Sequence, residues 1–484
     1  MSVAKHAARG VAWNMLFGVT SRMIQLVGTL ILTRFIAPAE YGDVLTASIA
    51  VMTAGVLTSF AFGQNIIAKN SPPEVAFQAM VLHVGIGIGA MVLVCAAQQP
   101  IGDFFDTPKM GHYIYGYALA HLFDRARYVP ERLIMRSLKF RTIASTNAIG
   151  ELLFTALALA FARPWGAKAI EFAAVIRSIV QCILYFRASP KNEWLVPTRL
   201  RRADVKDLFG YGLPIMVAAV SDRAATRWDN LIMTKLFDAA VMARYNLAYS
   251  LAEMPVNNIA EQIGEVLMPS FSRMEESQRA RNVVRTAALM AVIVTPLGVG
   301  LGAVSNTVVA CFFDARWAPM APMLLVLSVM TVFRPTMWSA IAYIQAVQKT
   351  RLVMFSSFFR AVVVLSGVAL GGALGDPVWA CVGGGIGYAL HAIVTIVVSG
   401  LVCKFSVRDY LVGVARPLIP CVPMFLAVIG IAHVLADAPR LVSLISQVAT
   451  GAVVYTLGAF VFLRPAVDDI LRLGREAIGK RKAS

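Results

Sequence analysis

The sequence predicts an all-α protein that crosses a membrane many times. Of its 484 residues, 58% are hydrophobic and only 15% are charged, a balance unlike that of a soluble enzyme. Apolar runs of about 20 residues, the length that spans a roughly 30 Å hydrocarbon core, recur from one end of the chain to the other. We therefore expect a polytopic membrane protein with about fourteen transmembrane helices.

The first expected helix covers 10–33. It is too long for a cleaved signal peptide, and no small-residue cleavage site follows it. The longest connection, at about 188–207, is rich in Pro and Arg, and no connection is long enough to hold a soluble catalytic domain. The further expected spans are 43–65, 75–98, 112–135, 143–163, 167–187, 208–236, 243–267, 286–312, 320–346, 351–373, 377–402, 411–435 and 441–463.

These spans group into two lobes of six helices. We expect an N-terminal lobe at 1–190 and a C-terminal lobe at 208–405, joined by a cytoplasmic linker at 191–207. Two additional helices at 406–464 and a cytoplasmic tail at 465–484 complete the expected organisation.

Basic residues predict the orientation of the chain. If the N-terminus is cytoplasmic, the connections on that side carry 27 lysines and arginines, whereas the outer loops and helix ends carry 8. Because cytoplasmic loops are enriched in Lys and Arg, both termini and the linker should face the cytoplasm. The same bias accounts for most of the formal charge of +17, so nucleic acid is not an expected partner.

The stretch 208–236 organises the prediction of function. It is apolar enough to span the bilayer, yet Asp222, Arg223, Arg227 and Asp229 lie around its middle. Each such charge costs about 2.5–3.5 kcal/mol at a bilayer centre, so these side chains should face protein or water. Helical spacing places the two aspartates on one stripe and the two arginines on the next. The charges form either an anion site or a set of ion pairs that only holds helices together.

An internal repeat links this stretch to the first helix. The segments LILTR at 30–34 and LIMTK at 231–235 lie 201 residues apart, and this offset aligns Arg22 with Arg223 and Gln25 with Thr226. Many transporters are built from repeats with the substrate site between them. We expect the two six-helix lobes to superpose by rotation about an axis near the membrane normal.

The second lobe adds charges of both signs. Glu253, Glu261 and Glu265 recur on one face of the helix at 243–267, where they either pair with the arginines or line an aqueous path. Arg334 and Arg360 are two further basic residues at membrane depth. We expect them to face the same water-filled cavity as Arg22, Arg223 and Arg227.

Other basic residues in the first lobe are weaker candidates. The helix at 112–135 carries Arg125 and Arg127 beside Asp124, and the helix at 167–187 carries Arg177. Because Asp124 is able to neutralise a neighbouring arginine, we rank these residues below Arg223.

Motifs of soluble enzymes and metal sites are missing from the sequence. The six cysteines lie in or beside apolar segments without metal-ligand spacing, so no metal and no cofactor is expected. The runs GIGIG at 85–89 and GGGIG at 383–387 lie inside apolar helices, where close helix packing is a better explanation than phosphate binding.

Three stretches resemble one family of transporters: LTRFIAPAEYG at 32–42, SFAFGQNIIAKN at 59–70 and AYSLAEMPVNNIAEQIGEVLMPSFSRM at 248–274. They are similar to segments of the Wzx-type polysaccharide and O-antigen flippases, in the polysaccharide-transporter branch of the multidrug/oligosaccharidyl-lipid/polysaccharide superfamily. The longest is similar to exporters of the colanic-acid type. Ala37 stands where the family usually has Gly, and Ala243-Arg244-Tyr245 replaces a Gly-Tyr-Tyr pattern.

The resemblance implies a transporter and not an enzyme, located in the cytoplasmic (inner) membrane of a bacterium. Its substrate would be an oligosaccharide repeat unit linked to undecaprenyl pyrophosphate, moved to the outer leaflet by alternating access for exopolysaccharide, capsule or O-antigen lipopolysaccharide synthesis. Membrane lipids are expected partners, and a polymerase and a chain-length regulator of the same pathway are candidates. In the family, the arginine that matches Arg22 lies in a cationic central cavity.

The candidate site residues fall into two sets. Arginine suits a pyrophosphate because its planar fork binds phosphate bidentately and stays charged. The expected substrate-binding residues are Arg22, Gln25, Arg223, Arg227, Arg334 and Arg360. The residues expected to serve ion coupling or structural pairing are Asp222, Asp229, Glu253, Glu261 and Glu265.

Two other functions remain open at this stage. A cation-coupled multidrug exporter, or an exporter of another lipid-linked substrate, belongs to the same superfamily, but drug export would favour an acidic cavity. A membrane polysaccharide polymerase or glycosyltransferase would normally need a large outer loop or a pair of catalytic carboxylates, and the outer loops are short.

Overall fold

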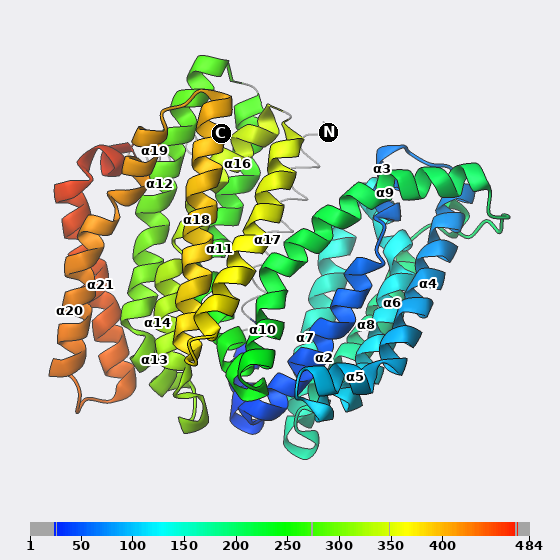
Figure 1. The fold of residues 1–484 in the computed structure, drawn as a ribbon, viewed down its shortest axis with the longest axis horizontal. Helices are drawn as coiled ribbons and strands as arrows, with labels where there is room; N and C mark the ends of the chain where they lie inside the picture. Colours follow the sequence, from blue (N-terminus) through cyan, green and yellow to red (C-terminus); the bar gives the residue numbers. More distant parts are fainter. Residues whose placement is uncertain (1–23, 26, 273, 348, 470–471, 473–484) are drawn as a thin grey trace. The chain divides into compact units, whose positions relative to one another are not determined.

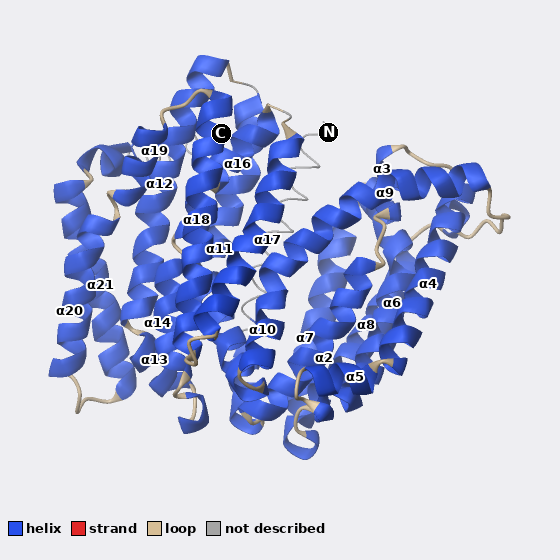
Figure 2. Cartoon of the chain, in the orientation of Figure 1, coloured by secondary structure: helices blue, strands red, loops and turns tan. Residues whose placement is uncertain are grey.

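The computed structural model describes residues 24–25, 27–272, 274–347, 349–469 and 472. Within these ranges every regular element is a helix, and short loops join them (Figure 2). By its internal contacts the chain divides into two compact units, Met1–Ala243 and Arg244–Ser484. The predicted division into two six-helix lobes and two further helices remains a prediction.

The first unit begins with helical residues 24–25 and 27–35. Its helix α6 packs against α2, α3, α4, α7 and α8, so that the polar face of α6 lies inside the unit. The elements of the first unit are α2 (Pro38–Leu57), α3 (Phe62–Ala68), α4 (Pro73–Ala96), α5 (Gln98–Phe104), η1 (Pro108–Met110), α6 (Gly111–Arg136), α7 (Phe140–Trp165), α8 (Lys168–Ala188), η2 (Lys191–Glu193), α9 (Arg202–Arg223), η3 (Ala224–Trp228) and α10 (Asp229–Leu236).

The span predicted at 43–65 is broken in the structure. Helices α2 and α3 meet at an angle of 47°, and Ala61 between them has a left-handed backbone with φ 50°. Proline at the first helical position starts α2 and α4, where its missing N–H costs no hydrogen bond. The break leaves the last carbonyl groups of α2 without the helical partners they would have in a continuous span.

The stretch 208–236 is not one continuous α-helix. A π-helical turn, η3, separates α9 from α10. Its hydrogen bonds run from i to i+5, so it inserts extra residues into the turn and changes which side chains share a face. Asp222 is exposed whereas Asp229 is fully buried. The prediction that these two aspartates form one stripe is therefore wrong.

The second unit contains the rest of the chain. Helices α12 and α18 are its central elements, because each packs against several others (Figure 1). The elements are α11 (Ala239–Ser272), which begins in the first unit, α12 (Glu276–Ala303), α13 (Ser305–Phe312), η4 (Ala315–Trp317), α14 (Met320–Met330), α15 (Phe333–Thr336), α16 (Trp338–Ala346), α17 (Thr350–Gly372), α18 (Pro377–Cys403), α19 (Val407–Ala415), α20 (Leu418–Val434) and α21 (Arg440–Phe462).

Glycines bring α17 and α18 together. A Cβ atom at Gly383 would fall on the backbone of Gly367, and one at Gly387 would lie 2.6 Å from the carbonyl oxygen of Val363. The prediction that GGGIG serves helix packing is therefore confirmed. In GIGIG, by contrast, only Gly87 has a close neighbour, the side chain of Arg125.

Eight helices in the described part of the chain are long and apolar enough to cross a membrane, or nine if α2 and α3 together form one span. Helix α6 does not pass on composition, since it carries six charged side chains between Asp124 and Arg136. Buried charge of this kind is tolerated in membranes where it faces protein or water. The number of fourteen spans and the cytoplasmic position of the termini remain predictions.

Candidate functional site

The candidate site is a cavity of about 430 Å³ inside the first unit. Helix α6 contributes the largest share of its wall, and α2, α4, α8 and α9 contribute the rest. The lining residues are Ser48, Val51, Met52, Gly55, Val56, Ser59, His83, Tyr117, Ala120, His121, Asp124, Arg125, Arg127, Tyr128, Glu131, Arg132, Ala174, Arg177, Ser178 and Arg223.

The wall of this cavity is cationic. Its five arginines face two lining carboxylates, Asp124 and Glu131, which leaves a formal excess of three positive charges with both histidines neutral, or of two when Glu151, the partner of Arg177 behind the wall, is counted. Positive charge in a cleft with low-dielectric walls attracts anions. A chemical group with two or more negative charges would therefore be favoured here.

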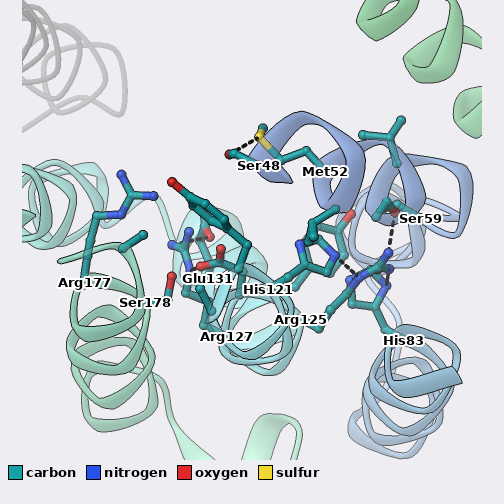
Figure 3. A pocket seen from close by; sticks show the side chains of 18 of the residues that line it. Ser48, Met52, Ser59, His83, His121, Arg125, Arg127, Glu131, Arg177 and Ser178 are labelled. Carbon is teal, nitrogen blue, oxygen red and sulfur yellow. Dashed lines mark hydrogen bonds and ion pairs between the residues drawn. The ribbon is translucent and has the colours of Figure 1, made fainter. Parts of the chain in front are cut away.

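Two of the five arginines already have carboxylate partners. Arg127 donates to Asp124 at 2.8 Å and contacts Glu131 at 3.4 Å, one turn apart along α6. Arg177 on α8 lies 3.2 Å from Glu151 on α7. Figure 3 shows Arg177 and Ser178 on one side of the cavity and the Arg127–Glu131 pair between them and His121. These ion pairs tie the wall of the cavity together.

Arg125 is buried, and its partners among the described residues are all neutral. It donates to His121 Nε2 at 3.0 Å, to the Thr58 hydroxyl at 2.7 Å and to the carbonyl groups of Gly55 and Thr58. The terminal nitrogen that donates to the Thr58 carbonyl also lies 3.3 and 3.4 Å from the two ring nitrogens of His83. Its charge is thus not compensated by a carboxylate.

The remaining two, Arg132 and Arg223, form no ion pair within 4 Å among the residues that the structure describes. The guanidinium of Arg132 lies over the Tyr128 ring at 5.1 Å, and Tyr128 in turn stacks on His83 at 4.3 Å. Gly63 leaves space for this arrangement, since a Cβ there would contact both Arg132 and Tyr128. These two arginines are the lining cations with most capacity to bind an anion.

The predicted substrate-binding residues that fall in the first unit are placed as follows. Arg223 lines the cavity, whereas Arg227 beyond the start of the π turn is exposed and is not among the lining residues. Gln25 is helical and exposed, and Arg22 lies outside the described residues. Whether these four residues bind substrate together remains a prediction.

The two aspartates of the central stretch have different surroundings. Asp229 is fully buried, and its Oδ1 accepts hydrogen bonds from the backbone and the side-chain amide of Asn230 at 2.9 and 3.0 Å. Asp222 is exposed, at the end of α9. The π turn therefore separates two residues that helical spacing would have placed together.

The candidates that fall in the second unit are described in part. Arg360 on α17 and Glu253 on α11 are both half-buried within the second unit. The side chains of Arg334, Glu261 and Glu265 lie outside what the structure describes. Their assignment to substrate binding, ion coupling or pairing remains a prediction.

Sequence reasoning gave too little weight to α6. The sequence contains the signal, since six arginines lie in α6, α8, α9 and η3 of the first unit: Arg125, Arg127, Arg132, Arg177, Arg223 and Arg227. Arg125, Arg127 and Arg177 were ranked low because of Asp124, and Asp124 does pair with Arg127. What no pattern indicated is that His83 and His121 lie against Arg125.

The second unit has a cavity of a different kind. It measures about 540 Å³ and is lined mainly by apolar residues of α12, α20 and α21, with Gln447 and Thr456 among its few polar groups. Among the described residues, no cluster of His, Cys, Asp or Glu side chains could hold a metal ion.

Known proteins resemble this chain over most of its length. The sequence pattern of a family described as polysaccharide biosynthesis protein matches residues 31–322, more than half of the chain. Lipopolysaccharide biosynthesis protein WzxC of Escherichia coli (strain K12) is 22% identical over 86% of each chain. Teichuronic acid biosynthesis protein TuaB of Bacillus subtilis (strain 168) is 21% identical over 98% of this chain and 99% of that protein.

Solved structures show the same fold at low sequence identity. The lipid II flippase MurJ in an inward closed conformation aligns with a TM-score of 0.77 at 12% identity, covering 94% of this chain and 99% of that one. An inward-facing multidrug resistance MATE family transporter of the MOP superfamily aligns with a TM-score of 0.62 at 15% identity, covering 82% of this chain and 98% of that one. The fold is therefore that of a flippase and of multidrug transporters.

Proposed function

Because the chain belongs to the polysaccharide biosynthesis protein family, we propose that it moves a lipid-linked oligosaccharide across the bacterial inner membrane. The substrate is an oligosaccharide repeat unit on undecaprenyl pyrophosphate, carried from the cytoplasmic to the outer leaflet by alternating access. The product serves the synthesis of exopolysaccharide, capsule or O-antigen. The chain is a multi-pass membrane protein, which is the setting that this activity requires.

The observation that carries the proposal is the cationic cavity of the first unit. A pyrophosphate brings negative charge into a membrane, where it needs fixed positive partners. Arginine provides them in bidentate form without depending on pH. Five arginines against two carboxylates favour an anionic substrate over a cationic drug.

We assign the substrate's pyrophosphate to Arg132 and Arg223. Both line the cavity, and neither has a carboxylate within ion-pair distance among the described residues. Arg22 and Gln25 of the N-terminal lobe, and Arg227, Arg334 and Arg360 of the C-terminal lobe, are proposed to contribute as well. The carboxylates Asp222, Asp229, Glu253, Glu261 and Glu265 are proposed to couple ions or to pair with these arginines.

The assignment is tested by binding. Purified protein in nanodiscs is titrated with undecaprenyl pyrophosphate, and the affinity is compared between wild type, Arg132→Gln and Arg223→Gln. Each variant should weaken binding by about tenfold or more, because a charge-assisted hydrogen bond contributes about 1.5–3 kcal/mol. Lys206→Gln is the matched control, since it removes one exposed charge from the other end of α9.

A multidrug exporter is the outcome that would replace this proposal. In that case lipophilic cations should compete for the cavity, and undecaprenyl pyrophosphate should bind wild type and both arginine variants equally weakly. A cavity with excess positive charge should instead repel such cations.

A further inference from the structure

Every N–H donor of the Arg125 guanidinium has a hydrogen-bond acceptor. A guanidinium carries five N–H groups and no acceptor. The Nε group donates to His121, one terminal nitrogen donates to the Gly55 carbonyl and the Thr58 hydroxyl, and the other donates to the Thr58 carbonyl at 3.2 Å. This last nitrogen also lies 3.3 and 3.4 Å from the two ring nitrogens of His83, one of which accepts because arginine only donates.

Arg125 differs from the other arginines of the cavity in that all of its hydrogen-bond donors are engaged. With all five donors engaged, it has none left for a phosphate oxygen. Its partners are carbonyl, hydroxyl and imidazole groups, none of which carries a negative charge. Arg125 therefore contributes positive potential to the cavity without being able to bind the substrate directly.

The groups that Arg125 binds lie at the break between α2 and α3. Gly55 belongs to the last turn of α2, and Thr58 is its C-terminal cap residue. The carbonyl groups at the end of a helix lack intrahelical partners, and inside a membrane no lipid atom replaces them. Arg125 supplies a partner from α6 to the Thr58 carbonyl, and it adds a second one to the Gly55 carbonyl, which also accepts from the Thr58 N–H at 3.3 Å. The Thr58 hydroxyl, in turn, donates to the Ala54 carbonyl at 2.8 Å.

Two glycines make room for this arrangement. A Cβ atom at Gly55 would collide with the imidazole of His121, and one at Gly87 would lie 2.9 Å from Cγ of Arg125. The histidines fix the guanidinium in turn. His121 lies one helical turn before Arg125 on α6 and accepts from its Nε. His83 approaches from α4, and its ring stacks on Tyr128 of α6. Three helices thus converge on one side chain (Figure 3).

We propose that Arg125 is a positioning residue, which clamps the broken end of α2 and so fixes the α2 wall of the cavity while Arg132 and Arg223 bind the substrate. This inference rests on the proposed function for the identity of the substrate. It assigns His83 and His121 the role of holding the clamp as neutral acceptors. The break in the α2–α3 span is then set at its angle by α6.

The first test measures the bend itself. Spin labels at Ala39→Cys on α2 and Ala68→Cys on α3, in protein whose native cysteines are replaced, report the distance across the break by pulsed electron paramagnetic resonance. Unmutated protein should give one narrow distance distribution. Arg125→Gln and Arg125→Lys should both broaden it, because lysine keeps the charge but lacks the fork that reaches all the acceptors. An unchanged distribution in both variants would overturn the proposal.

The second test separates positioning from binding. Arg125→Lys should bind undecaprenyl pyrophosphate within about twofold of wild type while its transport rate falls tenfold or more. A loss of affinity equal to that of Arg223→Gln would mean that Arg125 is a ligand, and would overturn the clamp. If instead neither wild type nor Arg223→Gln binds the lipid while Arg125→Lys still broadens the distance, the proposed function fails and the clamp stands.

Conservative replacements keep the test usable if Arg125 variants fail to fold. His121→Gln retains an acceptor for Arg125 Nε, whereas His121→Ala removes it. We expect His121→Gln to keep the narrow distance distribution and His121→Ala to broaden it. Equal behaviour of these two variants would contradict a role for His121 as the acceptor.

Discussion

The arginines of the cavity differ in what their guanidinium groups already bind, and this decides the role expected of each. Arg127 and Arg177 are held by carboxylates and Arg125 by neutral acceptors, whereas Arg132 and Arg223 have no carboxylate partner among the described residues. A side chain that is already satisfied stabilises the wall. A side chain without a carboxylate partner carries a cost in the membrane, which a bound anion removes.

Removal of the Arg127 charge should affect stability before it affects transport. Arg127→Gln leaves Asp124 and Glu131, which lie about two turns apart on α6, half-buried and without the cation that they share. We expect a loss on the order of 1–3 kcal/mol, between the values for exposed and buried pairs. The measurement is the thermal midpoint in detergent together with membrane abundance. Adding Asp124→Asn should recover part of the loss, and an additive double mutant would show that the pair is not coupled.

Arg223 should behave in the opposite way. Arg223→Gln should leave abundance and thermal midpoint close to wild type while polymer export is lost, and Arg223→Lys should retain part of the export because it keeps the charge. Export is measured in cells as surface polysaccharide, with protein level measured by immunoblot. Reduced abundance that is rescued by removal of Asp222 would instead identify Arg223 as a structural pairing residue.

A carboxylate at the start of α9 should make the fold sensitive to acid. Hydrogen bonds from Lys69 and Asn65 lower the pKa of Asp207 below its ordinary value. Because the folded-state pKa is depressed, the stabilisation is present above the ordinary aspartate pKa of about 3.9 and is lost as pH falls through the lowered value. Asp207→Asn should flatten the acid limb of the thermal midpoint against pH. An identical acid limb in the variant would rule out Asp207 as its source.

At the scale of elements, the breaks in two spans position the site. The α2–α3 break supplies the carbonyl groups that hold Arg125, and the π turn η3 turns Asp229 inward while Arg227 stays exposed. Helix α9 packs on α2, α3 and α4, which brings Arg223 to the cavity wall. Irregular helices of this kind are frequent at functional sites.

The contact of α9 with the α2–α3 loop depends on one glycine. A Cβ atom at Gly212 would fall on the carbonyl oxygen of Phe60, whereas one at Gly210 would meet nothing within 4 Å. We expect Gly212→Ala to lower the thermal midpoint and Gly210→Ala to raise stability by about 0.5–1 kcal/mol, through helix propensity alone. Equal effects of the two substitutions would mean that the α9 contact is not as close as the structure places it.

Sequence patterns predicted the elements better than their irregularities. Apolar runs located the spans, including 75–98, 143–163 and 377–402, which correspond to α4, α7 and α18. Spacing rules that assume a continuous α-helix failed at η3, where the chain forms a π turn and Trp228 at its end donates to the Thr53 hydroxyl of α2 at 3.2 Å. The saturated Arg125 was equally out of reach, since its partners come from three helices far apart in sequence.

At the scale of the whole molecule, the distribution of Lys and Arg predicts the orientation of the chain in the membrane. The linker at 191–207 should be cytoplasmic, because basic residues concentrate on that side. A single cysteine at Leu195, which is half exposed, should resist a membrane-impermeant maleimide in intact cells and react once the membrane is opened. A cysteine at Ala436 lies in the connection between α20 and α21, which the same orientation places outside the cell, and it should react in both conditions. Labelling of the linker cysteine in intact cells would show that the predicted orientation is wrong.

Movement of the lipid-linked substrate in proteoliposomes tests the central claim most directly. Undecaprenyl-pyrophosphate-linked oligosaccharide is placed in the membrane with purified protein, and an impermeant lectin or glycosidase reports how much has changed leaflet. Wild-type protein should make nearly the whole pool accessible within minutes, whereas Arg132→Gln and Arg223→Gln should leave accessibility close to that of protein-free vesicles. Transfer by the Arg132→Gln, Arg223→Gln double variant at the wild-type rate would contradict the cationic cavity as the substrate site.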